Sequence, residues 1–418
     1  MITMLRAIPT LVCTFALFTL SLGQCLTDND STQPINKDAR TKLYFGEQTF
    51  TLNMLKALRT SSPNENIFFS PYSTFHALLL VYFGAKGNTE TELKNALNLN
   101  WASSKFDVMQ AYRFEESQRK RRAANASVVF RAADKIFVSR ETAFKDCMKD
   151  LFHEEFETLD FKNDAENSRV YINKFVENVT NNNIKDILIP GTITQATDLV
   201  VANAAYFKGQ WASKFSPDDT FKGIFFSTPE KHNFVDMMFK KGVFNHAVNE
   251  RLGCHVLEIP YLGEENGISM MIFLPPFTPN GLENVLTRLT PEELEQALDE
   301  GLSREVELQL PRFSFEKTYQ MVPVLSDMGV KNLFESNANL SGFSDTANLQ
   351  LDDAVHKAKI EVNEEGSTAA AATVLFSFRS SRPLEPAQFF CDHPFMFLIY
   401  DHKSKAVLFA GVYRGPDQ

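Results

Sequence analysis

The sequence contains little cysteine and little tryptophan. Of its 418 residues, five are cysteine and two are tryptophan. The cysteines are far apart and include no CxxC pair; they are Cys13, Cys25, Cys147, Cys254 and Cys391. This spacing excludes a disulfide-dense scaffold and a recognisable zinc cluster, and it leaves open whether a single bridge forms.

Motifs of the common enzyme classes are also missing. GxSxG, HExxH, GxGxxG and GxxxxGK[ST] do not occur in the sequence. Residues 117–120 fit SxxK but lack the SDN and KTG partners, so chance explains the match. The eight histidines are scattered, and none stands in a pattern that pairs a nucleophile with a base. We therefore expect a protein that is not an enzyme, with no metal site and no required cofactor.

The charge balance argues against a nucleic-acid partner. Acidic residues outnumber basic ones by 52 to 42, which gives a formal net charge of −10.

With 44% hydrophobic and 22% charged residues the chain can build a large core. No low-complexity linker interrupts it, so we expect one domain over residues 40–418, preceded by a polar segment over 26–39, and we expect a monomer.

Only the N-terminus contains a long apolar run. Arg6 precedes apolar residues from 11 to 22, and small residues follow at Ser21 and Gly23. This layout predicts a signal peptide over residues 1–25, cleaved near Gly23 to Cys25, because the run is too short for a comfortable membrane span. We expect a secreted, extracellular protein with no membrane partner. Four N-x-S/T tripeptides are then candidate glycosylation sites, at Asn29, Asn125, Asn178 and Asn339.

Helical patterns dominate the first half of the chain. Apolar residues at helical spacing predict a helix over residues 42–58. Ser70 before Pro71 predicts an N-cap, and Thr89 with Glu92 predicts a capping box ahead of residues 93–97. Thr290 followed by Pro-Glu-Glu predicts another helix start, and Gly301 its end.

Strand patterns dominate the second half. Residues 305–310 alternate polar and apolar, as in a half-buried strand, and residues 269–274 and 407–413 are short apolar runs typical of buried strands. Helices first and strands later, without βαβ alternation, predict an α+β fold with mainly antiparallel sheets.

One segment has an unusual composition. An acidic strand ending in Glu364 and Glu365 leads into Gly366, then a series of tiny residues, then the apolar stretch 374–378, and finally an Arg/Ser cluster. A helix would suit the alanines, but the flanking glycine and the β-branched and aromatic residues do not suit a long one. A flexible linker would not contain so apolar a stretch.

This segment, EEGSTAAAAT over residues 364–373, resembles the hinge of an inhibitory serpin. Other stretches resemble serpin motifs in the same order along the chain, namely residues 66–73 (NIFFSPYS), 203–211 (NAAYFKGQW), 354–358 (AVHKA), 390–397 (FCDHPFMF) and 409–411 (FAG). The resemblance implies a serpin fold of about nine helices around three mainly antiparallel sheets. An exposed reactive-centre loop would span about residues 364–386.

The resemblance also implies a mechanism and residue roles. A protease cuts the loop and forms an acyl-enzyme, and the cleaved loop then inserts into the central sheet and distorts the protease, a process that is also a general example of strand addition. The hinge residues would be Glu364, Glu365, Gly366, Ser367, Thr368, Ala369, Ala370, Ala371 and Ala372. The sheet-opening cluster would be Ser70, Ser73, Asn203 and His356, with Trp211 at the point of first insertion. If this segment forms a strand from Ser367, alternate side chains face the core, and all of them are uncharged: Ser367, Ala369, Ala371, Thr373 and Leu375. No proline occurs between Gly366 and Ser381, so each residue can donate a backbone hydrogen bond to a neighbouring strand.

The bond that the protease cuts is left as two alternatives. The usual family spacing points to Ser380-Ser381, which suits an elastase-like or papain-like protease. A trypsin-like pocket with a buried carboxylate prefers arginine, so we favour Arg379-Ser380. The main hypothesis is therefore inhibition of an extracellular trypsin-like serine protease. A non-inhibitory serpin that acts as a carrier or storage protein is the alternative.

A basic run, Arg119, Lys120, Arg121 and Arg122, lies where the family often binds glycosaminoglycans. A solvated charged surface is the plainer interpretation. Two other interpretations are that the run binds a heparin-like polyanion that acts as an activator, or that it is a furin-like cleavage site.

Overall fold

The computed structural model describes Leu26 and residues 36–123, 129–263, 267–345, 349–365 and 385–416. Its α-helices within these ranges are α1 (Ala39–Ser61), α2 (Pro71–Gly84), α3 (Gly87–Ala96), α4 (Lys105–Ala123), α5 (Asp146–Leu151), α6 (Ala165–Val179), α7 (Gly281–Arg288), α8 (Pro291–Asp299) and α9 (Met321–Asp327). Two short 3-10 turns are η3 (Pro217–Asp219) and η4 (Asn332–Phe334).

The strands form two hydrogen-bonded sheets in the described part of the chain. The first seven strands are β1 (Ile67–Phe69), β2 (Val129–Ser139), β3 (Phe156–Leu159), β4 (Leu199–Lys208), β5 (Phe221–Phe226), β6 (His232–Asn249) and β7 (Cys254–Pro260). The others are β8 (Ile268–Leu274), β9 (Leu302–Pro311), β10 (Phe313–Gln320), β11 (Asp353–Val362), β12 (Ala387–Phe390), β13 (Phe395–Asp401) and β14 (Ala406–Tyr413). The predicted α+β class is confirmed.

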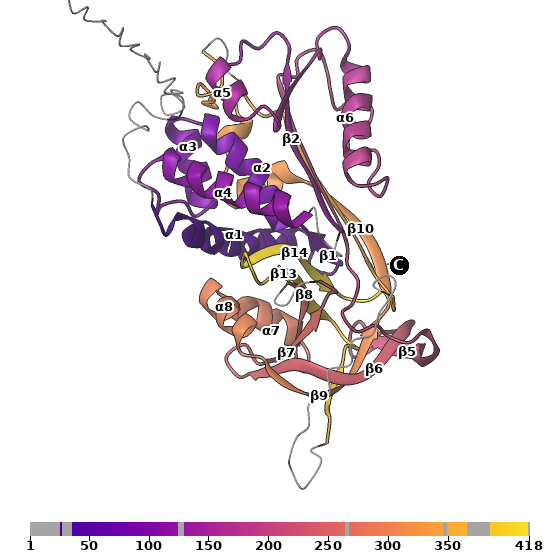
Figure 1. The fold of residues 1–418 in the computed structure, drawn as a ribbon. Helices are drawn as coiled ribbons and strands as arrows, with labels where there is room; N and C mark the ends of the chain where they lie inside the picture. The colour runs from indigo at the N-terminus through magenta and orange to yellow at the C-terminus, as the bar shows by residue number, and fades with distance from the viewer. Residues whose placement is uncertain are drawn as a thin grey trace, which may run out of the picture.

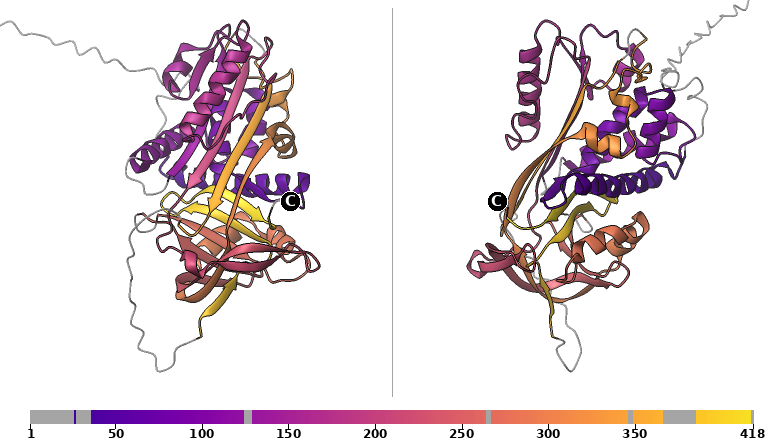
Figure 2. Two further views of the ribbon diagram at one scale, coloured as in Figure 1. Left: turned by 90° about the vertical axis from the view of Figure 1, so that its right-hand side faces the viewer. Right: turned by 180° about the vertical axis from the view of Figure 1, so that it is seen from behind.

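The smaller sheet has five strands in the order β10-β11-β4-β2-β3. Helices α1 to α4 cluster on one side of its long strands, and α6 lies along the other side (Figure 1). Its central strand β4 is buried up to its last residue, Lys208, because both faces are covered. The strands run along the length of the molecule toward the second sheet (Figure 2).

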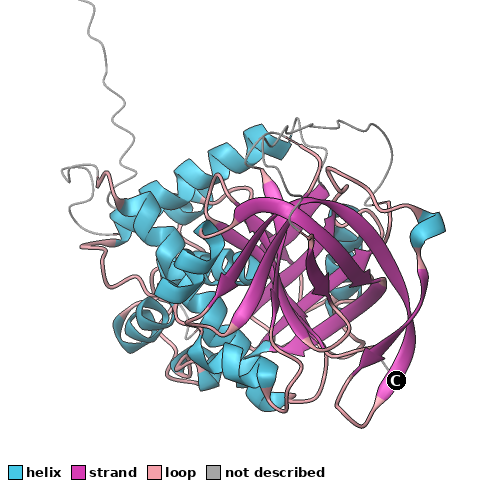
Figure 3. Ribbon diagram, turned by 90° about the horizontal axis from the view of Figure 1, so that it is seen from below, coloured by secondary structure: helices cyan, strands magenta, loops and turns pink. Residues whose placement is uncertain are grey.

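The larger sheet has nine strands, and β6 joins its two halves. The first part of β6 pairs with β5, its middle with β9, and its end with β7. The resemblance implied three sheets, but the continuous β6 merges two of them into one curved hydrogen-bonded network (Figure 3). Most pairings are antiparallel as expected, but β11–β4, β2–β3 and β12–β9 are parallel.

Aromatic side chains pack the two sheets together. Phe68 on β1 is fully buried, stacks on Phe409 of β14 at 5.0 Å and meets Phe315 of β10 edge-on at 5.9 Å. These rings tie strands of the larger sheet to an edge strand of the smaller one. The many phenylalanines of the sequence therefore serve, in part, as the packing between sheets.

Most of the predicted helix starts are confirmed, and one is wrong. The Ser70 hydroxyl accepts a hydrogen bond from the Ser73 amide at 3.1 Å, and Thr290 accepts one from the Glu293 amide at 3.2 Å. The Thr89 capping box does not form, because α3 already begins at Gly87. The Thr89 hydroxyl instead accepts from the Asn339 amide at 2.9 Å, in a contact between distant parts of the chain.

Candidate functional site

The centre of the five-stranded sheet is the junction of β4 and β11. The two strands are parallel and paired directly, with Asp353–Lys359 opposite Val200–Tyr206. The chain leaves β11 at its Val362 end, so a segment that turned back there would run antiparallel to both strands. Antiparallel pairing on both sides is the geometry in which one added strand can form two hydrogen-bonded ladders.

A polar cluster spans this junction. His356 of β11 lies opposite Asn203 of β4, and its Nδ1 donates to the Asn203 side-chain oxygen at 2.5 Å. The Ser70 amide donates to His356 Nε2 at 2.9 Å, which fixes the tautomer with the proton on Nδ1. The imidazole is fully buried, and this desolvation lowers the pKa of His356 to about 3. The ring is therefore neutral and connects two strands to the start of α2.

The polar cluster extends from Asn203 to side chains of α2 and β2. The Asn203 amide group donates to the Ser73 hydroxyl at 2.7 Å and to the Asp134 carboxylate at 2.8 Å, and Ser73 also donates to Asp134. The Ser70 hydroxyl donates to the Leu408 carbonyl at 2.8 Å. The four residues predicted for this cluster thus meet in space. Asp134 on β2 was missed, because it stands in a strand that also contains Arg131 and Lys135 and nothing local distinguishes it.

A second set of contacts holds the chain just before the loop. Trp211 is buried, stacks on Tyr261 at 4.5 Å, and its Nε1 donates to the Asn363 carbonyl at 2.8 Å. The Phe215 amide donates to the Glu364 carbonyl at 3.2 Å. Trp211 was predicted at this place, whereas Tyr261 and Phe215 were not.

The Glu364 side chain is held as well. The Thr220 hydroxyl donates to its carboxylate at 2.8 Å, and Arg312 lies 3.8 Å from the same oxygen. Glu364 is 7% exposed although it is the first residue of the predicted hinge. We call Phe215, Thr220, Arg312 and Glu364 the loop clasp. It holds the entry of the loop two residues beyond the Val362 end of β11.

Much of the predicted loop lies outside the described residues. This applies to the hinge from Gly366 through Ser367, Thr368, Ala369, Ala370, Ala371 and Ala372, and to the reactive-bond candidates Arg379, Ser380 and Ser381. Glu365 and Glu385 are the last described residue before it and the first after it. The returning chain forms β12, which pairs in parallel with β9.

The other predicted sites differ in how far the structure describes them. Asn29 and Asn125 lie outside the described residues, whereas Asn178 and Asn339 are exposed. The basic run lies in the last part of α4, and Lys120 is the residue of the four whose side chain is described. Its ammonium group pairs with Glu116 at 3.2 Å and Glu154 at 2.5 Å, and the bond to Glu154 raises the pKa of Lys120.

The cysteines divide into two kinds. Cys147 is disulfide-bonded, whereas Cys254 and Cys391 are free and buried. Burial raises the pKa of both free thiols, so neither is a reactive thiolate.

Among the residues that the structure describes, no group of three or more His, Cys, Asp or Glu is placed to hold a metal ion. Among the helices that the structure describes, none has the length and apolar character needed to cross a membrane.

Comparison with known proteins gives a consistent result. The model of the family described as "Serpin (serine protease inhibitor)" matches residues 46–416. Serine protease inhibitor 88Ea of Drosophila melanogaster is 44% identical, and the match covers 91% of this chain and 92% of that protein. Leukocyte elastase inhibitor of Sus scrofa is 35% identical, with 88% and 97% covered. The crystal structure of uncleaved ovalbumin has a TM-score of 0.79 at 28% identity and covers 90% of this chain and 100% of that one.

Proposed function

The chain belongs to the serpin family of serine protease inhibitors and is not an enzyme, and we propose that it traps an extracellular trypsin-like protease by inserting its cleaved loop into the five-stranded sheet. The observation that carries the proposal is the directly paired β4–β11 junction, beside which the loop clasp holds Glu364. A chain that turned back after Glu365 would run antiparallel to both strands, so the loop residues could enter between them as one added strand.

The energy balance of insertion is favourable. Opening the sheet breaks the single ladder between Asp353–Lys359 and Val200–Tyr206, and a new central strand forms one ladder on each side. At about 1 kcal/mol per hydrogen bond, the net gain of one ladder is of the order of 10 kcal/mol, before packing is counted. The small residues of the hinge add no charge or bulk that would oppose their burial.

The specificity proposal concerns the bond after Arg379. An arginine side chain suits a protease pocket that contains a buried carboxylate, and Pro383 disfavours Arg382 as the bait. Ser380 is the alternative, and the name of the related leukocyte elastase inhibitor is compatible with it. The test is separate incubation with trypsin and with pancreatic elastase, each followed by SDS gel electrophoresis and sequencing of the released fragment.

The results separate the alternatives. An SDS-stable band near the summed masses, with a released fragment that begins at Ser380, supports trapping at Arg379. A fragment beginning at Ser381 assigns the elastase-like alternative. Cleavage of the loop without a stable complex would instead contradict the inhibitory mechanism and favour a carrier or storage protein.

We also propose that the protein is secreted. The N-terminal apolar run after Arg6 supports this, because its length and layout are those of a secretory signal peptide. Expression in secreting cells, with and without residues 1–25, tests it. Treatment with an N-glycosidase tests whether any of Asn29, Asn125, Asn178 and Asn339 carries sugar.

Polyanion binding at α4 is proposed only as a secondary property. The pairing of Lys120 with Glu116 and Glu154 offsets its charge locally, which weakens the attraction for a polyanion. If the basic run binds heparin, then replacing Arg119, Lys120, Arg121 and Arg122 by glutamine lowers the salt concentration that elutes the protein from a heparin column. Unchanged elution would leave the run as a solvated surface.

A further inference from the structure

An apolar ridge lies along the hairpin formed by β5 and β6. Phe234 of β6 is 69% exposed, and Ile224, directly opposite on β5, is 40% exposed. Phe226, two residues further along β5, meets the ring of Phe277 at 5.2 Å, and Phe277 is 49% exposed. We call Ile224, Phe226, Phe234 and Phe277 the hairpin ridge. Neighbouring exposed apolar side chains of this size are typical of interaction surfaces.

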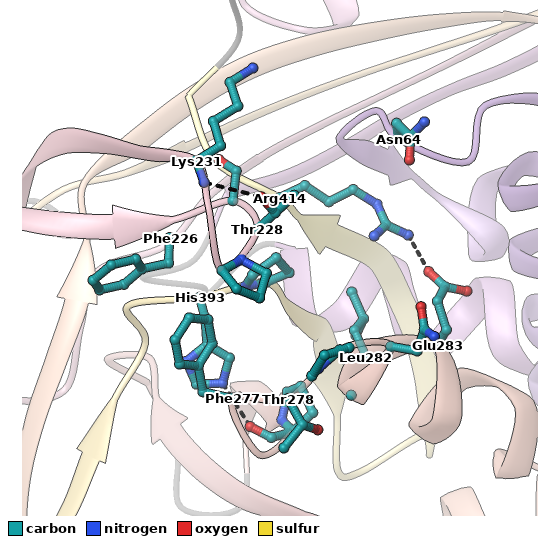
Figure 4. A pocket seen from close by; sticks show the side chains of 18 of the residues that line it. Asn64, Phe226, Thr228, Lys231, Phe277, Thr278, Leu282, Glu283, His393 and Arg414 are labelled. Carbon is teal, nitrogen blue, oxygen red and sulfur yellow. Dashed lines mark hydrogen bonds and ion pairs between the residues drawn. The ribbon is translucent and has the colours of Figure 1, made fainter.

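The ridge borders a cleft of about 1250 Å³. Phe226, Phe277 and His393 stand together at the cleft (Figure 4), and His393 donates to the Pro275 carbonyl at 2.7 Å while its ring packs 5.3 Å from Phe277. The prolines that line the cleft are Pro63, Pro229, Pro275, Pro276, Pro279, Pro394 and Pro416. Proline restricts the backbone, so a partner that binds here loses little free energy to ordering the surface.

Charged side chains at one end of the ridge form ion pairs within the protein. Lys222 pairs with Asp236 at 2.6 Å, and Arg312 pairs with the same carboxylate at 2.9 Å. Because these groups already have partners on the protein, a neighbouring apolar contact can exclude water without leaving an isolated charge. The surface thus favours a partner that presents apolar side chains.

The β5–β6 hairpin is hydrogen-bonded to the chain at both ends of the loop, and this position indicates which partner would contact the ridge. Immediately before β5, Thr220 bonds to Glu364, where the chain enters the loop. At the other end of β5, the Phe226 amide donates to the Asp392 carbonyl at 2.7 Å, just after the strand β12 in which the loop returns. The hairpin is therefore attached to both roots of the loop, and a protein seated on the loop lies next to the ridge.

We propose that the hairpin ridge is a second contact surface for the serine protease that docks on the loop. This inference rests on the proposed inhibitory function, since it concerns the complex that forms before acylation. The ridge contacts the body of the protease outside its active site and slows dissociation of this first complex. A longer-lived complex is acylated more often, so the second-order rate of inhibition rises.

The experiment compares ridge variants with a matched exposed site. The wild-type chain is first incubated with trypsin, chymotrypsin and pancreatic elastase to find which enzyme forms an SDS-stable complex. With that enzyme, the association rate constant and the stoichiometry of inhibition are measured for wild type, Phe234→Ala, Ile224→Ala/Phe234→Ala and Phe234→Glu. The control is Leu302→Ala, because Leu302 is 76% exposed and pairs with His246, toward the other end of β6 from Phe234.

We expect the double alanine variant to lose about tenfold in association rate, which corresponds to about 1.4 kcal/mol, and Phe234→Glu to lose more. The stoichiometry and the thermal unfolding temperature should stay at the wild-type values, because the substituted side chains are exposed. Leu302→Ala should inhibit at the wild-type rate. Rates within twofold for all variants would overturn the ridge proposal while leaving the inhibitory function intact, whereas no complex with any of the three enzymes would overturn both.

Discussion

At the scale of single residues, the decisive feature of the sheet junction is the neutral imidazole of His356. It donates to Asn203 and accepts from the Ser70 amide, which only the neutral ring can do. Protonation would remove the acceptor and place a charge in a fully buried site. The network is therefore satisfied in one protonation state, and the sheet junction depends on pH through this residue.

The pH dependence can be predicted with its sign. The pKa of His356 is lowered to about 3 in the folded chain, against an ordinary value of about 6.5 when unfolded. Between these values the unfolded chain binds the extra proton, so the free energy of unfolding falls as the pH falls, by at most about 1.4 kcal/mol per pH unit. We expect chemical denaturation between pH 6 and pH 4 to give a correspondingly shallower pH slope for His356→Gln.

A matched control is His153→Gln, because the His153 side chain is 74% exposed and 3.9 Å from Glu154 rather than buried in a network. This variant should keep the wild-type slope. Burial lowers the pKa of His246 to about 4, so this residue also makes the free energy of unfolding depend on pH. Both variants retain that contribution. Equal slopes for His356→Gln and wild type would show that His356 does not supply this pH dependence.

At the scale of elements, local signals in the sequence predicted the helix starts and strands that depend on local chemistry. Ser70 caps α2 because its hydroxyl and the Ser73 amide are three residues apart. The alternation over residues 305–310 predicted β9 because one of its faces is buried. Thr89 was misassigned because its hydroxyl bonds to Asn339, far along the chain, and no local pattern reports such a contact.

The candidate site likewise contains residues that the sequence predicted and residues that it did not. Ser70, Ser73, Asn203, His356 and Trp211 were found because they stand in motifs that resemble those of the family. The loop clasp was not found, since Thr220 and Glu364 are ordinary residues whose pairing exists only after the chain has folded. The burial of Glu364 also could not be predicted from an acidic, polar stretch of sequence.

The hinge permits a sharp test at the element scale. If residues 367–375 insert as a strand, alternate side chains face the core, and Ala371 belongs to the inward set whereas Ala372 faces outward. Ala371→Glu should then lower the fraction of SDS-stable complex at least tenfold, because insertion would bury an unpaired charge, and the chain should be cleaved as a substrate. Ala372→Glu is the control and should retain most of the complex. Equal losses for both variants would contradict strand insertion in this register.

At the scale of the whole molecule, the structure has two attached parts with different tasks. The larger sheet contains β12, the strand in which the chain returns from the loop, and the β5–β6 hairpin, which is hydrogen-bonded beside it. The smaller sheet holds the junction into which the loop would insert. The clasp at Glu364 connects the two, because Thr220 precedes β5 whereas Glu364 follows β11. Cleavage of the loop would let the hinge leave the clasp and enter the sheet.

This arrangement predicts that the cleaved chain is more stable than the intact one. The net gain of about one ladder, of the order of 10 kcal/mol, should raise the thermal unfolding temperature by about 10 °C or more and shift the guanidinium midpoint upward. The measurement compares intact protein with protein nicked in the loop by a catalytic amount of trypsin. Nicked Ala371→Glu separates insertion from mere cleavage, because it gains no trypsin site, is cut at the same bond and cannot bury its hinge. If nicked wild type and nicked Ala371→Glu unfold at the same temperature, the sheet does not take up the loop, and the trapping mechanism proposed for this chain is wrong.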